Sequence, residues 1–214
     1  MNIKFFNVAL GVALTATAIN ASAQKAYTSG AMTLSTEMRG QPAVMKAYFT
    51  PDSAAFSFTA GPATIKLLSD AKSTLMDIFV DVPVANMKKV AILTPAEIEQ
   101  ALDDMPKFTY VPGTETKTIS GFNCKKVVAT NTKTNKTYDV WITNDITLPS
   151  NAVAKYYAAI GGVPIQYTSF NSGQESSVTV TSITDEKAPA GTFAVSPDFE
   201  KISYDDLKQL GGGR

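Results

Sequence analysis

The chain has 214 residues, with 19 basic and 19 acidic side chains and no histidine. Nucleic-acid binding needs a clustered basic surface, and the adjacent basic pairs Lys88-Lys89 and Lys125-Lys126 are too short to form one, so a nucleic-acid partner is not expected. Without histidine, Ser-His and Cys-His hydrolase chemistry and an ordinary zinc site are excluded. The composition therefore favours a protein that is not an enzyme and that holds neither a cofactor nor a metal.

The first 23 residues have the pattern of a secretory signal. Lys4 supplies a positive start, the run from Phe5 to Ile19 is almost wholly apolar or small, and Ala21-Ser22-Ala23 resembles a cleavage site. The apolar run is shorter than the roughly 20 residues that span a bilayer. We therefore predict a signal peptide over residues 1–23, cut after Ala23, and a periplasmic or secreted protein without a transmembrane segment. Residues 24–214 are long enough for one domain with a sizeable core.

Short runs that alternate apolar and polar residues dominate the rest of the chain, which is typical of antiparallel strands with one buried face. Turn residues such as Gly40, Pro51 and Asn135 separate the runs. An up-and-down strand order follows most simply from these short connections. The predicted strands cover residues 32–38, 44–50, 54–60, 63–68, 74–81, 89–93, 116–120, 123–130, 137–143, 165–170, 177–183 and 192–195.

Three helices are predicted among these strands. The first starts at Thr94, where Pro95 and Glu97 complete a first turn with a capping box. The second covers residues 150–160, is apolar around most of its circumference and ends at a Gly-Gly pair. The third covers residues 203–210, with two acidic residues in its first turn. A helix as apolar as the second is either deeply buried or covers an apolar cavity.

These elements predict a mainly β, α+β fold. A sheet of so many short strands curls or closes, so we expect a strongly curved antiparallel sheet or half-open barrel with about three short helices covering its concave side. Its interior holds either an ordinary packed core or an apolar cavity with a pliable, methionine-rich lining, and the residues leave both open. The candidate lining residues are Met32, Leu34, Phe56, Phe58, Met76, Ile78, Trp141, Tyr156 and Tyr157.

Other chemically active residues offer weaker candidates. Cys124 cannot form an intramolecular disulfide; it is either a small buried hydrophobe or a thiol made reactive by Lys125 and Lys126. The neighbouring acids Asp103-Asp104 and Asp205-Asp206 fall at predicted helix ends. Sequence neighbours on a helix point in different directions, so surface and capping roles explain these acids better than catalysis.

The segment that contains Cys124 and the only tryptophan, Trp141, is predicted to form one long hairpin. Its runs Gly121–Lys126 and Tyr138–Thr143, together with Gly191–Glu200, resemble an uncharacterised family of exported bacterial proteins. That family is similar in fold to the lipoprotein carriers LolA and LolB and to the LppX lipid-binding group. The resemblance is most specific over residues 119–200.

The resemblance implies an unclosed curved sheet with helices over its concave side, and an acyl chain of a lipid or lipoprotein as ligand. It implies no catalytic residue. The arginine that helps LolA to bind lipoprotein has no counterpart, because Arg39 lies in a predicted turn and Arg214 at the end of the chain. Three hypotheses follow. The first is a binding protein for an apolar or amphiphilic ligand, and the second is an envelope scaffolding protein with a filled core. The third is an enzyme that acts through Asp, Lys or Tyr, for which Asp103, Asp104 and Lys126 are the residues to test.

Overall fold

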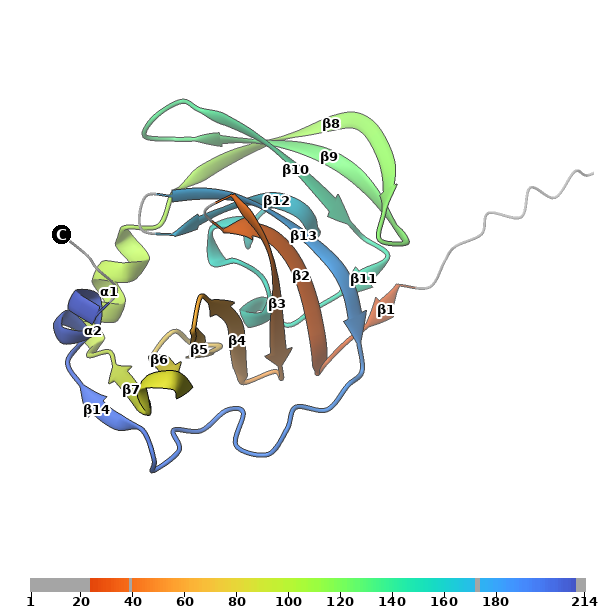
Figure 1. Ribbon diagram of the computed structural model, residues 1–214. Coiled ribbons are helices and arrows are strands. Elements are labelled where there is room, and N and C mark those ends of the chain that lie inside the picture. The colour runs from red at the N-terminus through yellow and green to blue at the C-terminus, as the bar shows by residue number, and fades with distance from the viewer. Residues whose placement is uncertain (1–23, 39, 172–173, 211–214) are drawn as a thin grey trace, which may run out of the picture.

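A computed structural model describes residues 24–38, 40–171 and 174–210 of the chain (Figure 1). The predicted signal peptide and its cut after Ala23 lie outside the described residues. Within them, none of the helices combines the length and the apolar composition that crossing a membrane requires.

Strands account for most of the described chain. They are β1 (Lys25–Ala26), β2 (Gly30–Met38), β3 (Gln41–Phe49), β4 (Ser53–Ala60), β5 (Ala63–Asp70), β6 (Met76–Val82), β7 (Met87–Ile92), β8 (Phe108–Ile119), β9 (Phe122–Asn131), β10 (Thr137–Thr143), β11 (Ile146–Thr147), β12 (Val163–Asn171), β13 (Gln174–Thr184) and β14 (Glu200–Ile202). The helices are α1 (Pro95–Asp103) and α2 (Tyr204–Leu210), and three short 3₁₀ turns are η1 (Pro83–Ala85), η2 (Ser150–Ala152) and η3 (Lys155–Tyr157).

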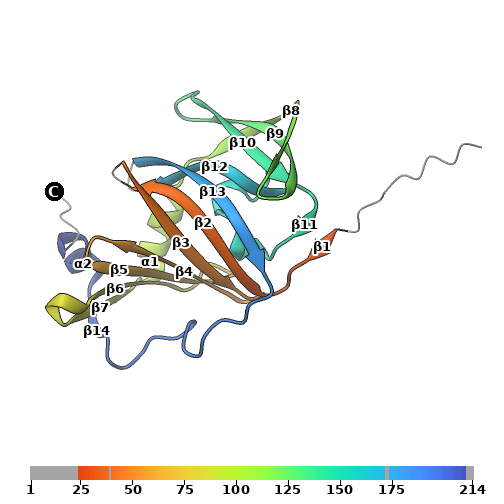
Figure 2. The same cartoon turned by 45° about the vertical axis from the view of Figure 1, so that its right-hand side comes forward.

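Twelve of the strands form one sheet in the order β14-β7-β6-β5-β4-β3-β2-β13-β12-β10-β9-β8. Strands β2 to β7 follow one another as hairpins, and β13 joins this half to the other by pairing antiparallel with β2. The pairing of β14 with β7 is parallel, which makes the sheet mixed. It does not close into a barrel, because β14 and β8 occupy opposite edges. Figures 1 and 2 show the two halves of the sheet curving toward one another. The expected mainly β, unclosed fold is thus confirmed, whereas the expectation of a wholly antiparallel sheet in up-and-down order was wrong, because β14 pairs in parallel with β7 and β13 returns to pair with β2.

Both α-helices lie against the end of the sheet formed by β6 and β7. The predicted capping box of α1 is present: the Thr94 hydroxyl accepts a hydrogen bond from the backbone of Glu97, whose carboxylate accepts one from the backbone of Thr94. Ile98 of α1 and Leu207 of α2 pack with Ala91 and Leu93 into one buried cluster. The helices therefore cover one end of one face of the sheet.

The prediction of about three helices was wrong, because residues 150–160 form only the turns η2 and η3. Val153 and Ala154 between these turns are extended, with ψ values of 144° and 123°. The tyrosine hydroxyls of the segment donate to residues of β12, so tertiary contacts decide its conformation. Residues 192–195, predicted as a strand, form turns in which the Thr192 amide donates to the Pro189 carbonyl.

Residues 185–199, which we call the crossover segment, connect β13 to β14 across the outside of the sheet (Figure 2). Its apolar side chains pack on a buried cluster contributed by β4 to β7. The buried members are Ala55, Leu68, Phe79 and Val90, and Phe193, Val195 and Phe199 lie against them. The crossover segment therefore covers the convex face, and the opposite, concave face carries the two helices and η2 and η3.

Candidate functional site

The strand register places six of the predicted lining residues on a single face of the sheet. Residues that are directly opposite each other on paired strands lie on the same face. One row across the sheet is Met32–Ala47–Phe56–Leu67–Ile78–Ala91. A second is Leu34–Met45–Phe58–Ile65–Val80–Lys89, and a third, shorter row ends at Met76. Because Ala91 packs beneath α1 and α2, this is the concave face.

The apolar side chains of this face differ in exposure along the sheet. At the β2 end, Leu34 is buried, with only 1% of its surface exposed. On β4 to β6, Phe56, Phe58 and Ile78 are only half-buried, and Leu67 is 36% exposed. We call these half-exposed residues, together with Ile65 and Val80, the concave apolar surface; it is a candidate binding surface.

Charge is nearly absent from these rows. Lys89 of β7 is the charged member of the rows given above, and its ammonium forms an ion pair with Glu200 of β14. A ligand on the concave apolar surface would therefore meet aliphatic and aromatic groups, with one already neutralised cation at the border. Such a surface suits an apolar chain rather than an ionic group.

The two predicted tyrosines lie on η3, where their hydroxyl groups tie this turn to the sheet. Tyr157 is fully buried, and its hydroxyl donates to the Thr168 carbonyl at 2.9 Å. The Tyr156 hydroxyl donates to Ser169 Oγ at 3.3 Å, and the Tyr110 hydroxyl donates to the Tyr156 carbonyl. Burial raises the pKa of all three tyrosines. They remain protonated donors at neutral pH and hold η3 in place.

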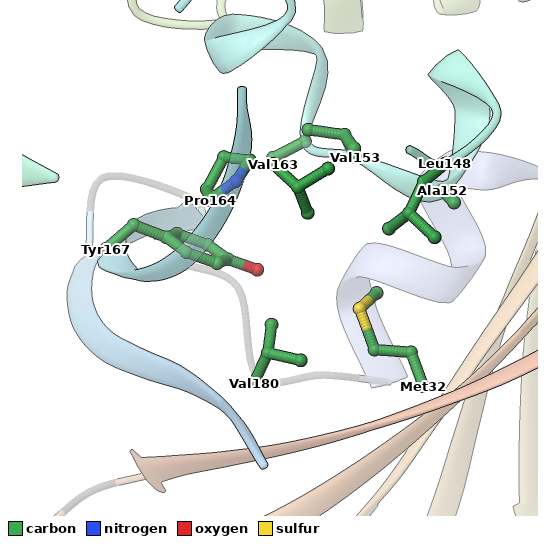
Figure 3. A pocket seen from close by; sticks show the side chains of 9 residues that line it. Met32, Leu148, Ala152, Val153, Val163, Pro164, Tyr167 and Val180 are labelled. Atoms are coloured by element: carbon green, nitrogen blue, oxygen red, sulfur yellow. The ribbon is translucent and has the colours of Figure 1, made fainter. Parts of the chain in front are cut away.

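A small cavity lies beneath η2, between this turn and the concave face (Figure 3). Its volume is about 10 Å³, which admits no more than about one water molecule. Apart from one tyrosine hydroxyl its lining is apolar. The lining residues are Met32, Leu148, Ala152, Val153, Ala154, Val163, Pro164, Tyr167 and Val180.

An open groove of about 320 Å³ lies on the other side of the same turn. Leu148, Val153 and Val163 line both this outer groove and the inner cavity, so they form the wall between the two spaces. At the end of the groove, Gly162 packs so closely on β10 that a Cβ there would lie 2.9 Å from the Thr143 carbonyl oxygen. Sequence reasoning missed this groove, because it predicted a continuous helix over residues 150–160, and the groove is lined by the turns and connections that residues 144–163 form instead, together with Gln24.

Trp141, the ninth predicted lining residue, lies on a different face from the other strand residues of the set. It stands opposite Gln166 and Lys126 on the neighbouring strands. The Lys117 ammonium lies 4.0 Å from the centre of its indole ring and donates to Gln166 Oε1 at 2.8 Å. Alternation in the sequence gives two faces to β10 but does not tell which one is concave, and Trp141 packs at the border of the buried cluster that contains Met32 and Leu34.

The acidic and basic candidates for catalysis do not converge. Asp103 and Asp104 lie at the end of α1, where Asp103 makes a 3.8 Å ion pair with Lys107. Lys126 on β9 is paired with Glu115 at 2.9 Å and Asp139 at 2.8 Å, and these contacts raise its pKa. A lysine held in its charged form is a poor general base.

Cys124 is buried, with 2% of its surface exposed, and burial raises the pKa of its thiol. The positive charge of Lys117 acts in the opposite direction but is a smaller effect. Of the two readings that the sequence left open, these contacts favour the buried hydrophobe.

Comparison with known proteins adds a fold likeness. No family model matches the chain, and no curated protein matches it. Two crystal forms of PNGF-II are similar in structure: the P21 form with a TM-score of 0.53 and 16% identity, and the C2 form with 0.49 and 18%. The alignments cover 86% of this chain but only 33% and 32% of PNGF-II, so the chain spans about a third of its length. At such identities the likeness concerns the fold alone.

Proposed function

We propose that the chain is a non-enzymatic, exported binding protein that holds an apolar or amphiphilic ligand, such as a lipid or a lipoprotein acyl chain, against its concave face. The observation that carries this proposal is the concave apolar surface of β4 to β6. On the same strands, the convex residues Ala55, Leu68 and Phe79 are buried beneath the crossover segment, whereas Phe56, Leu67 and Ile78 keep part of their surface open.

The arrangement of the surrounding elements supports this proposal. The helices α1 and α2 flank one end of the surface, and η2 contacts β3 and β4 near the other. A ligand between them would bury aliphatic and aromatic side chains at about 25 cal/mol per Å² of apolar surface removed from water. Residues 119–200 resemble an uncharacterised exported family that is similar in fold to lipid carriers, and this resemblance supports the same ligand class.

The test is native mass spectrometry and organic extraction of the full chain purified from the envelope fraction of cells that express it. We expect a mass higher than that of the polypeptide and a co-extracted lipid. The variant Leu67→Asp should lose this lipid, because it places a charge on the concave apolar surface. The matched control is Val44→Asp, which alters a 69% exposed valine on the convex side of β3 and should retain the lipid. A ligand-free mass for the wild-type chain, with no lipid extracted, would refute the proposal.

A second candidate function is an envelope scaffolding domain whose core is filled. The observation in its favour is the closeness of packing beneath η2, where the space left between this turn and the sheet is only about 10 Å³. Reproducible crosslinking of the full chain to one envelope protein, without any extracted lipid, would favour this function over ligand binding.

A further inference from the structure

Tyr167 differs from the other tyrosines that surround η3. Its ring packs against Tyr157 with centroids 5.6 Å apart, and its hydroxyl points into the inner cavity (Figure 3). Among the described residues, this hydroxyl has no hydrogen-bond partner, whereas those of Tyr110, Tyr156 and Tyr157 all have one. A protonated donor without a protein partner therefore faces an otherwise apolar space, where an acceptor that enters can pair with it.

The wall between the inner cavity and the outer groove includes η2, which fewer side-chain hydrogen bonds hold in place than hold η3. η2 lacks a side-chain cap, and the Asn151 side chain donates a single hydrogen bond, to the Thr50 carbonyl at 3.1 Å. The other amide atom of Asn151, Oδ1, is buried without a partner. By contrast, three tyrosine hydroxyls fix η3. A displacement of η2 would cost few hydrogen bonds and would join the cavity to the 320 Å³ groove, giving a space in the range that small ligands occupy.

The charges around this space restrict what it could hold. Among the described residues, the inner cavity is lined by no ionisable group except Tyr167, and burial raises the pKa of this tyrosine. A carboxylate or an ammonium would enter without a counter-charge, at a high desolvation cost. An uncharged oxygen that accepts a hydrogen bond would satisfy the Tyr167 hydroxyl at no such cost.

We propose that the inner cavity and outer groove form one site for an uncharged amphiphile, whose oxygen accepts a hydrogen bond from Tyr167 and whose aliphatic part lies against Leu148, Val153 and Val163. This rests on the proposed function and narrows its ligand class to neutral carbonyl, ester or hydroxyl compounds. Displacement of η2 is the step that admits the ligand.

The test is titration of the full chain with octan-2-one, octanoate and octylammonium at pH 7, followed by NMR of the Val163 and Val180 methyl groups. We expect octan-2-one to shift these signals and to bind at least about tenfold more tightly than either ion. Tyr167→Phe, which removes only the hydroxyl, should weaken octan-2-one binding about fivefold. The control Tyr48→Phe alters a hydroxyl that is bound to Glu186 at 2.8 Å on the exposed side and should bind like the wild type.

Equal affinity for octan-2-one and octanoate, or an unchanged affinity in Tyr167→Phe, would overturn this inference. Shifts at Leu67 and Ile78 without shifts at Val163 would also overturn it, while leaving the proposed function intact. Failure of all three probes, together with a ligand-free native mass, would refute both proposals. A second variant, Ala152→Val, narrows the inner cavity by two carbon atoms and should weaken octan-2-one binding.

Discussion

Asp77 is the only buried charged residue among the described residues, with 2% of its surface exposed. It lies on the convex face beneath the crossover segment, and its Oδ1 atom has no hydrogen-bond partner. Burial raises its pKa, against the weaker, opposing effect of Lys66 and Lys201. Lys66 is affected in the complementary way: burial lowers its pKa, while its ammonium lies 3.9 Å from the centre of the Phe79 ring.

The first prediction concerns the pH dependence that Asp77 confers. Its folded-state pKa exceeds the ordinary 3.8, so the native chain binds a proton more tightly than the unfolded chain does. Stability therefore increases as pH falls through the folded pKa toward 3.8, and the cost of ionisation is fully present above that range. We expect Asp77→Asn to raise the free energy of unfolding by about 1 kcal/mol at pH 7.5 and to have less effect near pH 4.

Urea denaturation of both chains at the two pH values measures this difference. Asp103→Asn, at an exposed position, is the control and should change stability little. A destabilised Asp77→Asn chain at pH 7.5 would show instead that Lys66 and Asp77 form a net stabilising pair.

A second residue-scale prediction concerns Cys124. A buried thiol with a raised pKa presents little thiolate at pH 8, so alkylation by iodoacetamide should be at least about tenfold slower in the native chain than in guanidinium. The rate is followed by intact mass. Equal rates in the two states would mean that the thiol opens readily to solvent.

At the scale of elements, the crossover segment depends on a few aromatic contacts. Phe199 meets the Phe79 ring edge to face, with centroids 5.2 Å apart. Phe199→Ala should lower the free energy of unfolding by about 2 kcal/mol, below the range for a fully buried phenylalanine because Phe199 is half-buried.

The same variant should become sensitive to limited proteolysis within residues 185–199 before the rest of the chain is cleaved. Lys187→Ala, an exposed change in the same segment, is its control. Uniform cleavage along the chain would show that the segment does not open separately.

The alternation of apolar and polar residues predicted the strands that have one buried and one exposed face, and the capping residues predicted α1. The alternation missed the first half of β8, because this strand lies at an edge of the sheet, where Pro112 and the exposed Val111 interrupt the pattern. It also missed β14, which is only three residues long. The apolar segment around Tyr156 and Tyr157 has a helix-like composition, yet hydroxyl contacts to other strands fix it as turns.

The candidate site, like the fold, was predicted only in part. Six of the nine lining residues share the concave face, because a period of two residues places every second side chain on one side of a strand. The inner cavity, into which the Tyr167 hydroxyl points, is lined by segments that are far apart in the chain, such as those that carry Met32, Val163 and Val180. Local periodicity carries no information on contacts between such segments.

At the scale of the whole molecule, an open sheet must protect its two edges from other chains. β14 is short, whereas β8 is twelve residues long and pairs on one side only, with β9. The β8 edge carries Pro112, the charged residues Glu115 and Lys117, and a register shift between Pro112 and Thr116. These are known devices against edge-to-edge pairing.

We therefore expect the double variant Pro112→Val, Lys117→Val to self-associate. It restores a backbone donor and removes a charge from the edge, which makes pairing with a second copy favourable. Sedimentation velocity should show dimers or larger species at concentrations where the wild type shows one species. Lys133→Val, in the exposed turn between β9 and β10, is the control, and equal sedimentation of all three chains would contradict the prediction.

The crossover segment also sets an order of assembly. β4 to β7 are synthesised early, but the residues that cover their convex face, Phe193 to Phe199, follow more than a hundred residues after Val90. Until the ribosome has added them, Ala55, Leu68 and Phe79 have no partner on that side. This part of the core is therefore completed only after residues 193–199 have been synthesised, and a nascent chain halted before Phe193 would expose an apolar surface that chaperones can bind.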